Sequence, residues 1–248
     1  MYSAAGPRRS NDMIKKVPHR FAYLISQQLH SLEGKRVVVS GAGNVAIYAI
    51  EKAHQLGGTV VACSDSDGYV LDEKGIDLEL LRELKEERRA RLDDYVRHVP
   101  HAVAAPGRTV WEVPCDLALP CATQNEIGGA EAAALVAGGC LAVVEGANMP
   151  TTPEAVRILG RAGVKFAPGK AANAGGVAVS ALEMQQNASR DSWTFAQSEQ
   201  RLRETMRDIH ARCWATAEEY GLPGDYVAGA NINGFRRVAE AMLAHGLV

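Results

Sequence analysis

The chain has 248 residues, of which 47% are hydrophobic, so it carries enough apolar surface to build a sizeable buried core. Its formal net charge of −2 gives no reason to expect nucleic acid or an anionic membrane as a partner, and no apolar stretch approaches the roughly 20 residues that cross a bilayer. The five cysteines form no CxxC pair and have no histidine at ligand spacing, which argues against a disulfide framework or a zinc site and favours a reducing, cytoplasmic setting.

The chain begins with a basic segment. Basic side chains outnumber acidic ones in its first twenty residues, but the apolar core of a secretory signal is missing. We expect residues 1–31 to be a leader or remnant that is partly disordered.

Strand and helix signals alternate from Lys35 onward, a pattern that predicts a doubly wound parallel sheet of the Rossmann type with helices on both faces. The expected strands are 35–40, 58–63, 115–119, 141–145 and 163–167. The expected helices are 44–56, 77–97, 129–138, 152–162 and 173–190. We assign residues 32–190 to this domain.

The most specific pattern is the glycine turn between the first strand and the first helix. Gly41 permits a tight turn, Gly43 allows close approach of the backbone to phosphates, and the small Ala46 lets the helix lie close to the strand. Unpaired N–H groups at the start of the helix attract an anion. The pattern therefore predicts a dinucleotide pyrophosphate site, the alternative being a glycine-rich turn in another kind of α/β unit.

The second expected strand ends at Ser64 and Asp65, close to the distance at which a ribose-binding acid follows such a turn. Further on, residues 82–91 form a charge run of mixed sign. Such a run usually forms the solvated face of a helix, and a cofactor-binding role is the alternative.

The C-terminal part has a different pattern, which predicts a helical extension over residues 191–248. Apolar residues at spacings of three and four predict one buried stripe on a long helix, which ends at Gly221–Gly224. The stripe consists of Leu202, Met206, Ile209, Cys213 and Ala217. A final helix is expected from about Gly234 to His245.

Five segments then match one family, in the family's order. They are Val39–Ala46, Ser64–Ser66, Leu119–Glu126, Glu145–Thr152 and Ala167–Val177. On these segments, and on the tail around Gly229–Phe235, the chain resembles the hexameric glutamate dehydrogenases, most closely the bacterial NADP-using type. The resemblance extends from about Leu32 to Val248 and implies their cofactor domain and tail.

The resemblance implies roles for individual residues in binding the dinucleotide. The pyrophosphate turn would comprise Gly41, Gly43 and Ala46, with Asn44 and Val45 at the start of the helix. The nicotinamide pocket would be lined by Ala122 and Thr123, and Asn148 and Asn173 would contact the nicotinamide ribose or carboxamide. For each asparagine, a hydrogen bond to its own loop backbone is the alternative.

The resemblance also implies two substrate contacts, Val177 and Ser180, which lie one helical turn apart. In the family the serine hydroxyl binds the side-chain carboxylate of the substrate, so Ser180 favours a dicarboxylate over an apolar amino acid. The alternative is that Ser180 is only a small packing residue.

The choice between NADP and NAD depends on the end of the second strand. Asp65 alone would favour NAD, because its carboxylate suits a ribose 2′-OH and repels a 2′-phosphate. Ser64 and Ser66 offer hydroxyl donors, however, and Lys85 and Arg88 match basic residues of the NADP-type enzymes. We therefore expect NADP, with NAD as the alternative.

The family's catalytic lysine and aspartate lie on a preceding substrate domain that has no counterpart in residues 1–34, and Lys170 is not a convincing substitute. We assign no catalytic residue and no metal site, and expect the chain to bind dinucleotide without turnover by itself. The alternatives are a stand-alone dinucleotide-binding or interaction module, or the cofactor domain of another amino acid dehydrogenase. The apolar C-terminal stripe leads us to expect a homo-oligomer, a dimer or larger.

Overall fold

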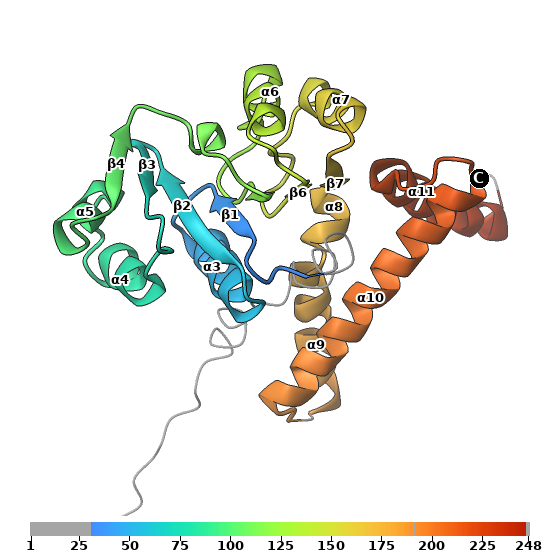
Figure 1. The fold of residues 1–248 in the computed structure, drawn as a ribbon. Helices are drawn as coiled ribbons and strands as arrows, with labels where there is room; N and C mark the ends of the chain where they lie inside the picture. The colour runs from blue at the N-terminus through green and yellow to red at the C-terminus, as the bar shows by residue number, and fades with distance from the viewer. Residues whose placement is uncertain (1–30, 191, 247–248) are drawn as a thin grey trace, which may run out of the picture.

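The computed structural model describes residues 31–190 and 192–246. The expected leader therefore lies outside the described residues, except for Ser31. A seven-stranded sheet has the order β4-β3-β2-β1-β5-β6-β7 (Figure 1). Its strands are β1 (Arg36–Val39), β2 (Thr59–Asp65), β3 (Gly68–Leu71), β4 (Val103–Pro106), β5 (Leu117–Leu119), β6 (Ala142–Val144) and β7 (Lys165–Ala167).

The sheet is parallel except for β3. β1 pairs in parallel with β2 and β5, and the parallel pairing continues through β6 to β7. β3 is antiparallel to both of its neighbours, β2 and β4. The predicted fold class is confirmed, with the five expected strands in place.

The side chains of the central strand β1 alternate between two hydrophobic clusters, one on each face of the sheet. Val37 and Val39 join a cluster that includes Ile50 of α3 (Asn44–Gln55), whereas Val38 joins a second cluster on the opposite face. The second cluster includes residues of α6 (Gly129–Ala137) and α7 (Pro153–Arg161). Because the helices after β1 and β5 cover opposite faces, the winding reverses between these two strands. The carboxyl ends of strands at such a reversal form a crevice where ligands bind.

The hairpin of β2 and β3, together with β4, is missing from our predictions. Asp65 pairs with Gly68 across a two-residue turn of Ser66 and Asp67. Gly68 has φ +147°, and a Cβ there would lie 2.3 Å from the Ala105 carbonyl oxygen. The run Ser64–Gly68, which reads Ser-Asp-Ser-Asp-Gly, is a cluster of turn-forming residues that could have revealed this turn.

The prediction of a single helix over 77–97 is wrong, because the helix is interrupted there. Arg89 adopts a left-handed backbone conformation with φ +51°, so no helix continues through it. The segment contains α4 (Leu78–Arg82), a π-helical turn at Glu83–Glu87, a 3₁₀ turn at Leu92–Asp94 and α5 (Tyr95–His98). Another 3₁₀ turn, Val110–Glu112, precedes β5.

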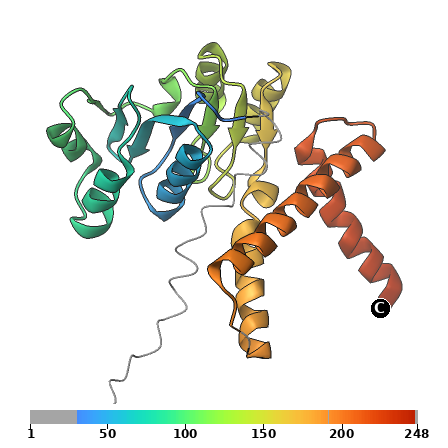
Figure 2. The same ribbon diagram turned by 60° about the horizontal axis from the view of Figure 1, so that its bottom comes forward.

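The C-terminal helices form a separate layer beside the sheet (Figures 1 and 2). They are α8 (Gly169–Ala172), α9 (Gly175–Ser189), α10 (Phe195–Glu219) and α11 (Tyr226–His245). The predicted stripe on α10 is buried except at Ile209, which is half-buried. α11 begins at Tyr226, well before the expected Gly234, because Asp225 caps it by accepting a hydrogen bond from the Ala228 N–H at 2.9 Å. Within 31–190 and 192–246, no helix is both long and apolar enough to cross a membrane.

Candidate functional site

The glycine turn lies where β1 meets α3. Gly41 has φ +85°, and a Cβ there would lie 3.3 Å from the Ala122 Cβ, so glycine permits both the turn and the close approach of the loop after β5. The Gly41 N–H donates a hydrogen bond of 3.1 Å to the Ser64 Oγ, which joins the turn to β2. Ala46 is fully buried, as expected for a residue at the contact of helix and strand.

The N-terminus of α3 is suited to an anion. Its N-cap, Gly43, has extended backbone, and within the described part of the chain neither a side-chain cap nor an acidic residue occupies the first turn. A Cβ on Gly43 would meet nothing within 4 Å, so the space in front of this backbone is open. The first helical amides therefore retain their capacity to bind phosphate oxygens.

A cavity of about 530 Å³ lies at the carboxyl ends of the parallel strands beside this turn. Five residues predicted as ligand contacts line it: Val45, Ala122, Asn148, Asn173 and Val177. The predicted Thr123 and Ser180 are not among its lining residues. The prediction missed the remaining lining residues, which are Cys121, Gln124, Gly146, Ala147 and Gly176. Each of them lies within two residues of a predicted residue in the same motif, so the motifs themselves contained the signal.

The cavity wall formed by the loop after β5 is held by Glu126. Its Oε1 accepts hydrogen bonds from the N–H groups of Ala122 at 3.1 Å and Thr123 at 3.2 Å. Ser40, at the end of β1, accepts a hydrogen bond from the Cys121 N–H at 2.8 Å. Burial raises the pKa of Glu126 above its usual range, although the hydrogen bonds from Ser40, Ala122 and Thr123 act in the opposite direction.

The two predicted asparagines meet on the other wall. The Asn173 Nδ2 donates to the Asn148 Oδ1 at 2.8 Å and to the Ala147 carbonyl oxygen at 3.2 Å. Asn173 therefore binds a neighbouring loop rather than its own. This bond orients both side chains beside the cavity.

The predicted ribose acid, Asp65, is engaged within the protein. Its carboxylate accepts hydrogen bonds from Lys85 Nζ at 3.1 Å and from the N–H groups of Leu92 and Asp67 at 3.0 Å each. Burial acts to raise the pKa of Asp65, but these hydrogen bonds and the Lys85 charge outweigh it and hold that pKa below its usual value. Asp65 thereby joins the interrupted helical segment, residues 78–98, to β2.

The remaining predicted polar residues lie at the turn between β2 and β3 or on the helical segment that is bound to it. Ser66 is exposed at the turn. Lys85 also donates to the Ala90 carbonyl oxygen at 3.1 Å, and the half-exposed Arg88 pairs with Glu83. The prediction missed Arg91, which is 72% exposed and pairs with Asp67 at 3.0 Å. The charge run over 82–91 contained it.

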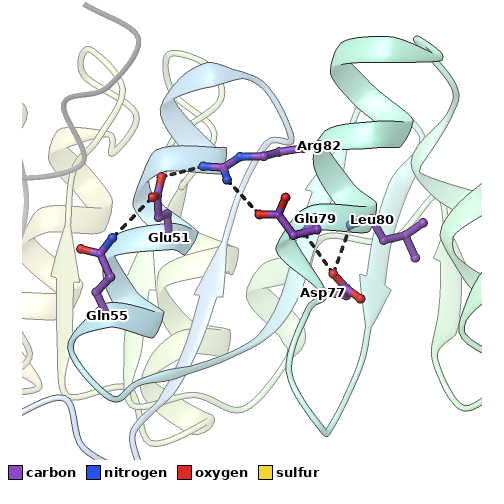
Figure 3. A network of polar contacts seen from close by, with 6 residues as sticks. All are labelled: Glu51, Gln55, Asp77, Glu79, Leu80 and Arg82. Carbon is purple, nitrogen blue, oxygen red and sulfur yellow. Dashed lines mark hydrogen bonds and ion pairs between the residues drawn. The ribbon is translucent and has the colours of Figure 1, made fainter. Parts of the chain in front are cut away.

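A polar network fixes α4 against α3 (Figure 3). Arg82 pairs with Glu51 of α3 at 2.6 Å and with Glu79 of α4 at 3.0 Å. Asp77 caps α4 through the N–H groups of Glu79 and Leu80. The network therefore fixes the segment that bears Lys85 and Arg88 relative to the glycine-turn helix.

The two predicted substrate contacts lie on α9. Val177 is 77% exposed and lines the cavity. Ser180 is exposed and donates a hydrogen bond to the Gly176 carbonyl oxygen at 3.2 Å, so it packs into no core. Its hydroxyl lies one turn along the helix from Val177 and is accessible to solvent. Across the described residues, no cluster of three or more His, Cys, Asp or Glu side chains could hold a metal.

Comparison with known proteins identifies a family that matches most of the chain. A family model described as Glutamate/Leucine/Phenylalanine/Valine dehydrogenase matches residues 20–246. The chain is 52% identical over 219 residues to the NADP-specific glutamate dehydrogenase of Escherichia coli, with 87% of this chain and 48% of that protein covered. It is 50% identical over 224 residues to the glutamate dehydrogenase of Bacteroides thetaiotaomicron, with 88% and 49% covered.

The fold has a close counterpart among solved structures. The glutamate dehydrogenase of Plasmodium falciparum matches with a TM-score of 0.91 at 40% sequence identity, and the match covers 96% of this chain and 53% of that one. The chain spans about half the length of the curated relatives that it matches.

Proposed function

Because the chain belongs to the glutamate/leucine/phenylalanine/valine dehydrogenase family, we propose that it is the dinucleotide-binding portion of an NADP-dependent glutamate dehydrogenase. The observation that carries the proposal is the uncapped N-terminus of α3, which opens beside a cavity at the winding reversal of the sheet. NADP and glutamate are the proposed cofactor and substrate because the relative from Escherichia coli, at 52% identity, bears the name NADP-specific glutamate dehydrogenase.

In this proposal the chain binds and orients the dinucleotide. The α3 amides hold the pyrophosphate, and the cavity lined by Ala122, Asn148 and Asn173 holds the nicotinamide ring. When bound, NADP⁺ would supply the hydride acceptor for the conversion of L-glutamate and water into 2-oxoglutarate, ammonium and a proton. Val177, which lines the cavity, and Ser180, one turn further along α9, are the proposed substrate contacts.

The hairpin tip is the proposed 2′-phosphate site. Ser66 offers a hydroxyl there, while Lys85, Arg88 and Arg91 supply positive charge. Because Lys85 already pairs with Asp65 at 3.1 Å, the carboxylate repels a 2′-phosphate less than a bare acid would. Arginine is suited to phosphate through paired N–H donors.

Calorimetric titration of the purified chain with NADP⁺ and NAD⁺ tests the proposal. We expect binding of NADP⁺ that is tighter than that of NAD⁺. Gly43→Ala should weaken binding about tenfold or more, because its methyl group occupies the open space where the pyrophosphate approaches. Gly160→Ala on α7 is the matched control, since a Cβ there also meets nothing within 4 Å. Absence of heat with both nucleotides would refute the proposal, as would equal binding by the two variants.

We infer further that the chain alone does not oxidise glutamate. The proposal assigns proton transfer to groups on other polypeptide, because the residues that line the described cavity include no lysine or carboxylate. Glutamate-dependent formation of NADPH, followed at saturating NADP⁺, should stay at the background rate, and appreciable turnover would contradict this inference. We also propose a reducing, cytoplasmic setting, which the five free cysteines support.

A further inference from the structure

A buried carboxylate lies behind the cavity wall that carries the two asparagines. Glu145 follows β6 directly and is only 5% exposed. Its Oε1 accepts a hydrogen bond from the Thr151 N–H at 3.2 Å, and its Oε2 accepts one from the Gly169 N–H at 2.5 Å. One side chain thus joins the loop after β6 to the loop after β7.

Both joined loops contribute to the cavity. The loop after β6 supplies Gly146, Ala147 and Asn148 to the lining, and Asn173 follows the other loop by one short helix. The loops are in tight contact at Gly169, where a Cβ would lie 2.9 Å from the Ala147 carbonyl oxygen. A shift of either loop would therefore move the wall.

The chemistry of this junction requires a carboxylate. Two backbone N–H groups converge from different loops, and an ionised carboxylate offers an acceptor oxygen to each. Glutamine has the same shape but offers one oxygen and one NH₂ group, so one N–H would face a donor. An unpaired buried donor is costly, and the loops would move apart to relieve it.

We propose that Glu145 is a positioning residue for the dinucleotide pocket, whose carboxylate holds the loops bearing Asn148 and Asn173 in register for the nicotinamide end of the cofactor. The role in binding rests on the proposed function. The role in fixing the two loops stands on the hydrogen bonds alone.

Two measurements on Glu145→Gln and Glu145→Ala test the proposal. In the free chain, amide hydrogen exchange should speed up in the peptides that contain Thr151 and Gly169. In calorimetry, NADP⁺ should bind about tenfold more weakly to Glu145→Gln and more weakly still to Glu145→Ala. The matched control is Glu131→Gln, which alters a carboxylate that accepts the Gly128 N–H at 2.9 Å at the start of α6, away from the cavity lining. It should leave both readouts within twofold of wild type.

The pH profile separates positioning from packing. Burial raises the pKa of Glu145, although the hydrogen bonds from Gly169 and Thr151 and the charge of Lys170 on α8 act against the shift. Protonation removes an acceptor, so acidification should weaken NADP⁺ binding more steeply in wild type than in Glu145→Gln. The 2′-phosphate and Glu126 are present in both proteins, so their effects on the pH profile of binding cancel in the comparison.

The outcomes are distinct. Unchanged exchange at both loops in Glu145→Gln would overturn the inference, whether or not NADP⁺ binds. If the wild type binds NADP⁺ and Glu145→Gln matches it in affinity and pH profile, the inference is also overturned while the proposed function stands. If the wild type fails to bind, the proposed function is lost, and the exchange data still decide the role of Glu145 in fixing the loops.

Discussion

Asp65 shows how the surroundings of a side chain change its role. Its position after the second strand favours a ribose ligand, yet its carboxylate is occupied by Lys85 and by two backbone N–H groups. Because these bonds need the ionised form, they hold its pKa below the usual value despite burial. Asp65 therefore contributes to stability through the segment that it anchors.

Replacing Asp65 with asparagine should alter the acid response of the fold. A lowered pKa means that the folded state stabilises the carboxylate, so this stabilisation is present above the ordinary aspartate pKa and is lost as pH falls through the lower folded value. We expect Asp65→Asn to lower the free energy of unfolding by about 1–3 kcal/mol at pH 7.

Urea denaturation at pH 7 and pH 3 measures this effect. The difference between Asp65→Asn and wild type should shrink at pH 3. Asp93→Asn, at an exposed position of the same segment, should behave as wild type at both pH values. A difference that stays constant with pH would contradict the role of the ionised carboxylate.

At the scale of elements, the segment 78–98 shows how tertiary contacts override helical periodicity. The buried residues Leu81, Leu84, Leu92 and Tyr95 have spacings that fit one continuous helix. The helix is instead interrupted near Arg89. There Lys85 donates a hydrogen bond to the Ala90 carbonyl oxygen, and the Leu92 N–H donates one to the Asp65 carboxylate. This interruption of the helix keeps Arg91 beside the turn between β2 and β3, where it pairs with Asp67.

The contact of α10 with α11 depends on one glycine. A Cβ on Gly229 would lie 2.0 Å from the Cys213 carbonyl oxygen, which is backbone and cannot move aside. Gly229→Ala should therefore separate the helices and lower the free energy of unfolding by about 1–3 kcal/mol or more. Gly234→Ala on the same helix meets nothing within 4 Å and should stabilise the protein slightly. Thermal denaturation followed by circular dichroism compares the two variants, and equal midpoints would show that the close contact is unimportant.

At the scale of the whole molecule, the end of α11 presents an apolar face to solvent. Phe235, Val238, Met242 and Leu243 are between 57% and 78% exposed and lie at helical spacing. The C-terminal half of α11 projects away from the sheet (Figure 2). Such a continuous exposed stripe is typical of an interaction surface.

We predict that this face joins two copies of the chain in solution. Met242→Glu should shift the protein toward monomer in sedimentation velocity measured over a range of concentrations, because the interface would bury a charge. Ala244→Glu introduces the same charge at roughly 200° around the helix from position 242 and should leave association unchanged. A monomeric wild type at all concentrations would refute the prediction.

The sequence by itself determined five of the seven strands of the described sheet, the glycine turn and the α10 stripe, because each depends on the spacing of residues within a short segment. The family resemblance, rather than spacing, named five of the ten residues that line the described cavity. The tertiary structure alone decided that Asp65 is an anchor, that Asn173 binds Asn148, and that Glu145 joins two loops. Buried polar groups must find partners, and here those partners come from segments far apart in the chain, so only the packed fold brings them together.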